Sequence, residues 1–150
     1  MISPINENGV LSDAKMEYIE LYNNSDYPIH LNGWELYRNA NPYIIIDNIN
    51  SMIFPDEYFL LGRESNYNEN GGIVIDFEYT GGLIDDSEDE LVLKDKYNLT
   101  ADSVYYDFSN EIWPGLPPGH SMELIRPDYD NSDGYNWGRP VDIYSGLNFG

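Results

Sequence analysis

The sequence predicts an all-β fold, a sandwich of two antiparallel sheets built from roughly eight or nine short strands. Three observations lead to this prediction. Gly, Pro, Asn and Asp recur at short intervals along the 150 residues, so the segments between turns are short. Apolar and polar residues alternate with a period of two in several of these segments. No segment with helical periodicity extends beyond about two turns. A small barrel is the second architecture that this pattern allows.

The first half of the pattern lies between Glu17 and Leu36. Ile19 and Leu21 fall on one face of a strand. The polar cluster Asn23–Asp26 predicts a turn, because short polar side chains bond their own backbone there. Asn32 followed by Gly33 predicts a tight hairpin, since both residues accept a positive φ. The predicted strands of this stretch cover residues 16–22, 28–31 and 34–38.

The middle of the chain continues in the same way. Turns are predicted at Asn39–Pro42 and Phe54–Glu57, and an exposed polar loop is predicted between Gly62 and Gly72. The acidic stretch Asp85–Glu90 is predicted to be a turn, and Asp95–Asn98 another. The predicted strands of this part cover residues 43–46, 58–61, 73–79, 91–93 and 102–106.

The C-terminal part is less regular. The proline-rich stretch Trp113–Gly119 predicts a strand-free connection, because proline fixes φ and donates no backbone hydrogen bond. Residues 121–126 form the last predicted strand. We expect one domain over residues 1–150, with a loose lead-in at 1–13 and an irregular tail at 127–150 that Trp137 anchors. All three tryptophans are expected in the core. The other predicted core residues are Ile19, Leu21, Leu31, Leu36, Phe59, Leu61, Leu91, Leu93, Val104, Met122 and Leu124.

The composition is strongly acidic. Lys and Arg total 7 against 27 Asp and Glu, which gives a formal net charge of −20. Phosphate groups are bound by basic side chains, so we expect no binding to nucleic acid or to anionic membranes. High net charge also keeps a protein soluble and monomeric. The oligomeric state is not predicted.

The location in the cell is an open question at the level of sequence. There are no cysteines, so there are no disulfides and no thiolate metal site. The N-terminus lacks the basic and apolar regions of a signal peptide, and no apolar run reaches the length of a membrane span. The chain is either cytosolic or a domain of a longer secreted or surface protein.

Four blocks of the sequence together are similar to the lamin tail domain family in its bacterial form. The first block opens with Glu17–Asn23 and continues through Leu31–Leu36, and the second is Phe59–Leu61. The third joins Asp89–Asp95 to Ala101–Tyr106. The fourth comprises Trp113–Pro114, Gly119–Ile125, Asp130–Ser132 and Asn136–Trp137. The chain departs from the family pattern where Glu88 and Asn98 replace glycines. Asn98 tolerates a positive φ, whereas a positive φ would strain Glu88.

The resemblance implies an immunoglobulin-like β-sandwich. It also implies a noncatalytic role, because bacterial members resemble accessory modules of surface or secreted proteins. We therefore expect a protein-interaction or scaffolding module, located outside the cytoplasm as part of a longer chain, that binds a protein partner through loops or an edge strand. A fold does not fix a function, so this expectation rests on analogy.

Calcium is the specific ligand that the acidic stretches suggest, and no other cofactor is predicted. The first candidate set contains Asp85, Asp86, Glu88, Asp89 and Glu90. The second set contains Asp128, Asp130 and Asp133, with Asn131. It resembles the start of an EF-hand loop, but Gly134 falls one residue late and Arg139 occupies the position of the closing glutamate. The alternatives are a solvated turn for the first set and a structural turn, as in the family, for the second.

Tyrosines off the predicted core face are the candidate partner-binding residues. Tyrosine offers a large contact area at a low cost in conformational entropy, and it also stacks on sugars. We single out Tyr22, Tyr27 and Tyr67, which makes glycan binding an alternative to protein binding. Ordinary packing within the sandwich is the simpler explanation.

Catalysis is not expected. His120 and Ser121 are adjacent, so on a strand they point to opposite faces and cannot form a nucleophile–base pair. No P-loop, dinucleotide-binding or zinc-protease motif is present. A hydrolase remains the third and least favoured class.

Overall fold

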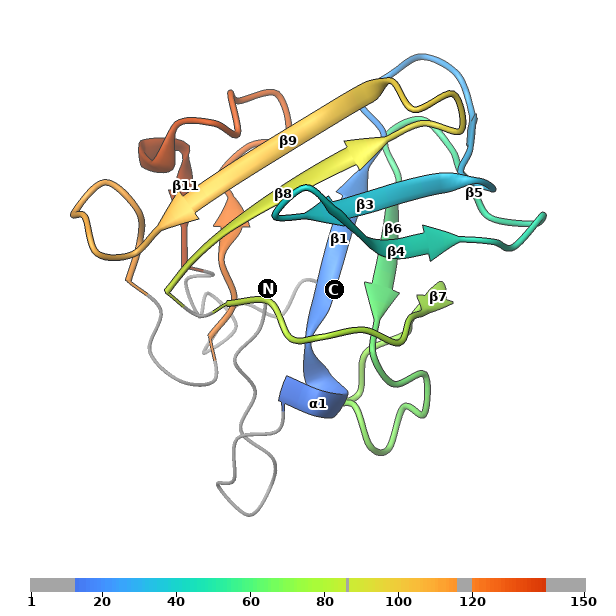
Figure 1. The fold of residues 1–150 in the computed structure, drawn as a ribbon, viewed down its shortest axis with the longest axis horizontal. Helices are drawn as coiled ribbons and strands as arrows, with labels where there is room; N and C mark the ends of the chain where they lie inside the picture. Colours follow the sequence, from blue (N-terminus) through green and yellow to red (C-terminus); the bar gives the residue numbers. More distant parts are fainter. Residues whose placement is uncertain (1–12, 86, 116–119, 140–150) are drawn as a thin grey trace, which may run out of the picture.

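A computed structural model describes residues 13–85, 87–115 and 120–139. These residues form a β-sandwich with very little helix (Figure 1). No helix in the described ranges has the length and apolar character that crossing a membrane would need. The elements are α1 Asp13–Met16, β1 Tyr18–Tyr22, β2 Ile29–His30, β3 Trp34–Arg38, β4 Asn41–Ile46, β5 Met52–Ile53, β6 Tyr58–Gly62, β7 Phe77–Glu78, β8 Glu88–Lys94, β9 Thr100–Asp107, β10 Glu123–Leu124, the 3-10 helix η1 Gly134–Asn136 and β11 Trp137–Gly138.

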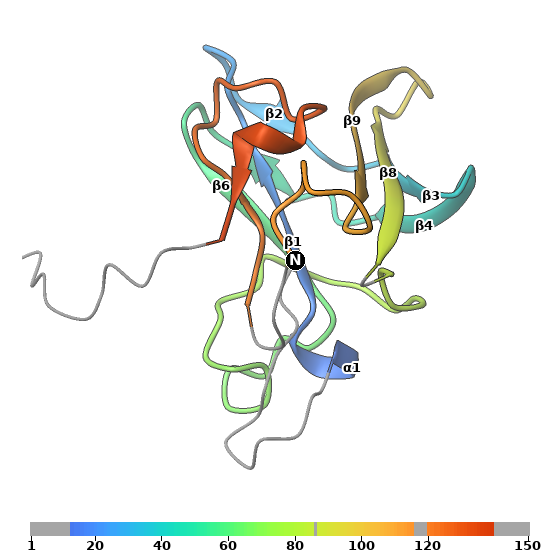
Figure 2. The same cartoon turned by 90° about the vertical axis from the view of Figure 1, so that its left-hand side faces the viewer.

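Two sheets make the layers of the sandwich. One has the strand order β4-β3-β8-β9 and the other has the order β1-β6-β7. Figure 2 shows them as two layers, and side chains from both sheets form one hydrophobic core. Two short ribbons, β2-β5 and β10-β11, complete the described strands. The predicted immunoglobulin-like antiparallel sandwich is confirmed, except that β7 runs parallel to β6.

The core follows the predicted alternation. Leu36, Ile44 and Leu91 come from one sheet and Phe59 and Leu61 from the other, and all five side chains are buried. Of the predicted core residues, Leu124 alone is outside this cluster and the partly buried residues packed on it. The pattern did not identify Ile44, Ile46, Ile53, Tyr79, Ile84 and Tyr106, which are also in the core.

The turn at Asn32–Gly33 is real, but it does not form the predicted hairpin. Trp34 donates a backbone hydrogen bond to Leu31 over 2.9 Å, and only Gly33 of the two central residues has a positive φ. β2 pairs with β5 instead of β3. A positive φ at the second central residue alone is typical of a type II turn, which splays flanking strands. The turn therefore carries the chain from one sheet to the next.

Other predicted boundaries are also wrong, among them the turn at Asn39–Pro42, whose last two residues belong to β4. Met16 belongs to α1, so β1 begins at Tyr18. Within residues 73–79 only Phe77–Glu78 is a strand. The Asp76 side chain accepts a hydrogen bond from the Leu60 amide, so the backbone of this segment pairs with β6 only after Asp76. Within residues 121–126 only Glu123–Leu124 is a strand, since its partner β11 has two residues.

The loop between Gly62 and Gly72, which is predicted to be exposed, contains one buried polar side chain that holds its backbone in place. Asn70 is 1% exposed. Its amide nitrogen donates to the carbonyls of Glu64 and Ile73, both over 2.8 Å, and its oxygen accepts from the amides of Gly72 and Ile73. All the hydrogen-bonding capacity of this side chain is thus spent on holding the loop.

The acidic stretch Asp85–Glu90 is not a turn throughout, because Glu88, Asp89 and Glu90 lie in β8. Asp89 points inward, where its carboxylate pairs with Arg38 of β3 and accepts the Asp85 amide over 2.9 Å. Since Glu88 is in a strand and has no positive φ, the strain considered for it does not arise. Asn98 does adopt a positive φ, of 64°, as its replacement of a family glycine predicts.

Candidate functional site

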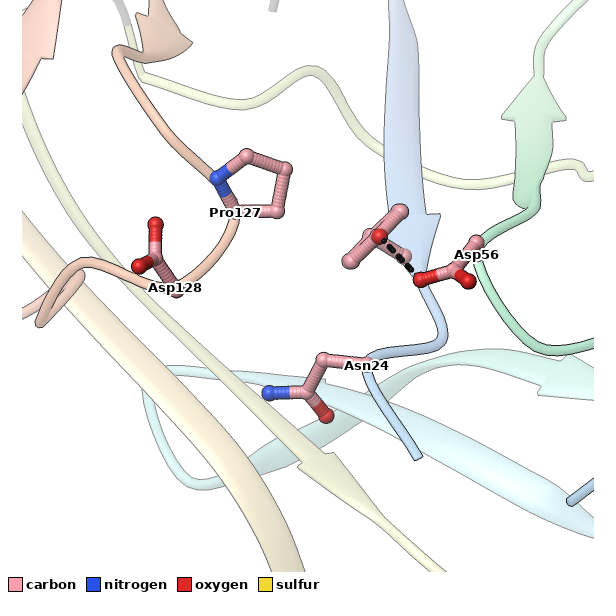
Figure 3. A pocket seen from close by; sticks show the side chains of 5 residues that line it. Asn24, Asp56, Pro127 and Asp128 are labelled. Carbon is pink, nitrogen blue, oxygen red and sulfur yellow. Dashed lines mark hydrogen bonds between the residues drawn. The ribbon is translucent and has the colours of Figure 1, made fainter. Parts of the chain in front are cut away.

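A surface hollow lies at the end of the sandwich where β1 finishes. Its volume is about 300 Å³, and Tyr22, Asn24, Asp56, Pro127 and Asp128 line it. Figure 3 shows Asp56 on one side and Pro127 and Asp128 on the other, with Asn24 below them. Three segments that are far apart in sequence therefore meet here. We call this hollow, together with Tyr27 and Tyr58 at its border, the loop-end surface.

The turn after β1 is held in place by Asn23, which is 2% exposed. Its oxygen accepts from the Ser25 amide over 3.0 Å, and its nitrogen donates to the carbonyls of Tyr27 and Ile53. The sequence predicted this local bonding. The tertiary bond to Ile53 also fixes the turn against β5, so Asn24 and Tyr27 are presented from a rigid support.

Asp56 occupies a strained turn opposite Tyr22. Its φ is 60°, which is uncommon for a residue with a side chain, and its amide donates to the Asn23 carbonyl over 2.9 Å. The Tyr22 hydroxyl donates to the Asp56 carboxylate over 2.9 Å. This hydrogen bond raises the pKa of Tyr22. The sequence predicted the turn that contains Asp56, but it gave no reason to select Asp56 as a functional residue.

Asp128 faces the hollow already paired. Arg126 donates to its two oxygens over 2.9 and 2.8 Å, which is a bidentate ion pair on the surface. The guanidinium lowers the pKa of Asp128 and also lies 5.1 Å from the Tyr129 ring. Both carboxylates that line the hollow therefore have hydrogen-bond donors within the chain.

Exposed aromatic surface borders the hollow. The Tyr22 and Tyr58 rings are 4.9 Å apart across the β1-β6 pair, and Tyr58 is 52% exposed. Tyr27, on the adjoining turn, is 66% exposed. Tyr67 is also exposed, but it lies in the loop after β6, near the start of β1. The hollow lies at the other end of β1, a strand about 13 Å long. The predicted partner-binding tyrosines thus divide into Tyr22 and Tyr27 at one end and Tyr67 at the other.

The first acidic set does not converge on one point. Asp89 is buried, while Glu88 and Glu90 alternate with it and are exposed on β8. Asp85 accepts from the Ser87 amide over 2.8 Å. Asp86 lies outside the described residues.

The second acidic set serves its own turns. Asp130 accepts from the Ser132 amide and hydroxyl, and Asp133 caps η1 through the Tyr135 amide. Asn131 donates to Asp102 of β9 over 2.8 Å. Over the described ranges, no group of three or more His, Asp or Glu side chains is arranged to hold a metal ion.

Among the residues that the structure describes, two carboxylates are buried, and protein donors bind both. Glu17, 3% exposed, accepts from the Tyr79 hydroxyl over 2.7 Å and from the Ile84 amide over 2.8 Å. Asp89 accepts from Arg38 and from two backbone amides. A general acid or base must reach a substrate proton, and these oxygens are turned to protein partners.

The sequence matches a known protein family. The model of the Lamin Tail Domain matches residues 1–108. That range contains the first three blocks of the resemblance, while the fourth block, from Trp113 onward, lies outside it. No curated protein matches the chain.

Proposed function

The chain belongs to the lamin tail domain family, and on that premise we propose that it is a noncatalytic, immunoglobulin-like interaction domain that binds a protein partner at the loop-end surface. We further propose that residues 1–150 act as one module, an accessory domain of a longer surface or secreted bacterial protein, and that it needs no cofactor. The observation that carries the proposal is the ring pair beside the hollow, in which a half-buried Tyr22 supports the exposed Tyr58.

Rigidity favours this surface. The Asn23 side chain and the Asp56 amide tie the two turns that flank the tyrosines. An aromatic side chain held by its surroundings loses little conformational entropy when a partner covers it. Tyrosine is also among the residues that most often dominate the energy of protein interfaces.

The charge restricts the partner. With a net charge of −20, the domain attracts basic surfaces and repels acidic ones. Asp56 brings negative charge to the hollow itself, whereas the charge of Asp128 is already balanced by Arg126. A partner with a basic patch around an apolar contact point suits this surface.

Site-specific cross-linking tests the proposal. A photoreactive phenylalanine analogue replaces Tyr58 in one sample and Tyr97, which is 72% exposed in the β8–β9 turn, in the control. We expect one protein from the source cells to cross-link at position 58 and not at position 97. With that protein purified, Tyr58→Ser should weaken binding by about 30-fold or more, as at an interface hot spot, and Tyr97→Ser should not. Equal effects at both positions would contradict the proposal.

Glycan binding is the second candidate, since an aromatic pair next to carboxylates is also suited to stacking and hydrogen-bonding a sugar. Titration of the ¹⁵N-labelled domain with a panel of neutral oligosaccharides separates the two. Saturable shifts at Asn24 and Asp56 would favour the sugar, and their absence would leave the protein partner.

A further inference from the structure

The strand β4 has one neighbour, β3, in the described sheet, so its other edge is open. The carbonyl of Ile46 accepts the Gly33 amide over 2.7 Å and therefore points toward the β3 side. Backbone groups alternate in direction along a strand, so the N–H and C=O of Ile45 point away from β3. Earlier in the strand, Pro42 lacks an N–H, and the Tyr43 carbonyl is close to Gly81. The free edge is thus the segment from Ile45 to Asp47.

A groove runs along this free edge. It has a volume of about 330 Å³, and it lies between β4 and β7, the open edges of the two sheets. Figure 1 shows both strands on the same side of the molecule. Ile45, which is 53% exposed, and Phe77 supply apolar surface, and Asp47 and Glu78 supply the charged side chains. We call this the edge groove.

The edge lacks most of the protection that natural edge strands carry. Such strands usually present a lysine, a bulge or a covering loop. Here Pro42 and the bulge beside Tyr37 protect only the first half of β4. The second half, Ile44–Ile46, consists of three β-branched residues with strong strand propensity.

We propose that the edge groove binds a basic, extended peptide segment of a partner protein by strand addition to Ile45–Asp47. Backbone hydrogen bonds to Ile45 provide the attachment, as in other domains that add a strand to an open edge. Ile45 and Asp47 lie on the same outer face, so the lysines or arginines of the peptide lie there, with their aliphatic stems along Ile45 and their charges toward Asp47 and Glu78. The alternate apolar side chains of the peptide face Phe77 in the groove. This inference rests on the proposed function as an interaction domain, but it uses a different surface.

Charge selects this occupant over a second copy of the chain. Glu78 is held by the amide and hydroxyl of Ser65, which lower the pKa of its carboxyl and keep it ionised. A second copy would bring a net charge of −20 and its own Asp47 to the same edge. Like charges placed directly opposite one another destabilise strand pairing.

The test uses the full chain, labelled with ¹⁵N, and a short end-blocked peptide that alternates lysine and valine. Addition of this peptide should shift the amide signals of Ile45, Asp47 and Phe77, with weaker binding at high salt because exposed charges are screened. A peptide that alternates glutamate and valine should not bind. The lysine peptide methylated at alternate backbone nitrogens should not bind either, since it cannot form the ladder.

Two variants locate the site. Ile45→Lys adds a charge to the open edge and should weaken peptide binding about tenfold or more, whereas Leu99→Lys, a similarly exposed position in the β8–β9 turn, should leave it unchanged. If Ile45→Lys lowers the thermal stability, the double variant Asp47→Asn with Glu78→Gln replaces it and should remove the salt dependence.

The outcomes separate this inference from the proposed function. Binding that Ile45→Lys weakens and Tyr58→Ser does not would support the edge groove. Shifts confined to the loop-end surface, equal binding of the acidic peptide, or a dimer in sedimentation that Ile45→Lys dissociates would overturn it. Shifts confined to the loop-end surface would favour the proposed function, and the other results do not bear on whether Tyr58 contacts a protein partner.

Discussion

Glu17 provides the most demanding test of the packing in this domain. Its Oε1 accepts from the Tyr79 hydroxyl over 2.7 Å, and its Oε2 accepts from the Ile84 amide over 2.8 Å. Tyr43 lies 3.2 Å from the same carboxylate, but its hydroxyl is closer, at 2.6 Å, to the Gly82 carbonyl. One side chain thus joins the start of β1 to the segment that crosses between the sheets.

Replacing Glu17 with leucine removes both acceptors and keeps an apolar volume. The Ile84 amide would then be buried without an acceptor, and the Tyr79 hydroxyl would lose its carboxylate acceptor. Each unsatisfied group costs about 1–3 kcal/mol, so we expect Glu17→Leu to lower the free energy of unfolding by about 4 kcal/mol. In a domain of this size that corresponds to a fall of roughly 10 °C in Tm. Glu17→Gln retains an acceptor and should lose about 1 kcal/mol or less.

The pH dependence follows from the burial of the same group. Burial raises the pKa of Glu17, so the folded state favours the protonated carboxyl. Its contribution to stability is complete below the unfolded-state pKa of about 4.3, and it decreases as pH rises through the higher folded-state pKa. Glutamine does not titrate. The stability of wild type relative to Glu17→Gln should therefore decrease between about pH 4 and pH 7.

Urea unfolding of the three proteins, followed by tryptophan fluorescence from pH 4 to pH 7, measures both effects. Equal stability of Glu17→Leu and Glu17→Gln at neutral pH would show that the hydrogen bonds make no net contribution. A wild-type advantage that grows with pH would refute the sign of the pKa argument.

Three further predictions concern the metal, the turn at Asn98 and the packing of η1. Thermal melts in EDTA, CaCl₂ and MgCl₂ should agree within about 1 °C, and a calcium-specific rise of several degrees would show a site that the described residues do not form. Asn98→Gly should leave stability unchanged within about 0.5 kcal/mol, whereas Asn98→Val should lose about 1–2 kcal/mol because its φ is 64°. Gly134→Ala places a Cβ 2.8 Å from Trp113 and should lose about 1–3 kcal/mol, while Gly115→Ala, with no atom within 4 Å, should not; equal melts would refute the close packing.

Turn chemistry made much of the fold predictable. The turns at Asn23–Asp26, Phe54–Glu57 and Asp95–Asn98 are where the sequence places them. The Asn23 and Asp95 side chains bond to backbone within a few residues, and the Glu57 amide closes the other turn on the Phe54 carbonyl. β3 has the predicted bounds, since it lies inside its sheet and pairs with a neighbour on each side. Local rules suffice wherever the partners are local.

Long-range partners account for the errors. Asp89 looks like part of a solvated turn, but Arg38, 51 positions away, compensates its charge inside the sandwich. The alternation of residues 73–79 is a valid strand pattern, yet only two of these residues pair with β6, in parallel. Neither the ion pair nor the limited pairing leaves a signal in the neighbouring sequence.

The candidate surfaces were only partly predictable for the same reason. Composition identified Tyr22 and Asp128 separately, as a partner-binding residue and a metal ligand. Their proximity depends on how the segment after β10 returns to the end of β1. Asp56 and the open edge of β4 could be recognised only once the strand order was known.

Most of the few Lys and Arg side chains already interact with other groups of the chain, and this determines what its surface can bind. Arg38 and Arg126 form ion pairs with aspartates, and Lys15 pairs with Glu69. Lys94 lies 4.0 Å from the Tyr37 ring. The remaining carboxylates must therefore be neutralised by solvent ions or by a partner. A basic partner reduces the repulsion among these carboxylates wherever it binds. Charge alone will therefore not distinguish the loop-end surface from the edge groove. The distinction depends on the contacts that differ, which are aromatic at Tyr58 and backbone hydrogen bonds at Ile45.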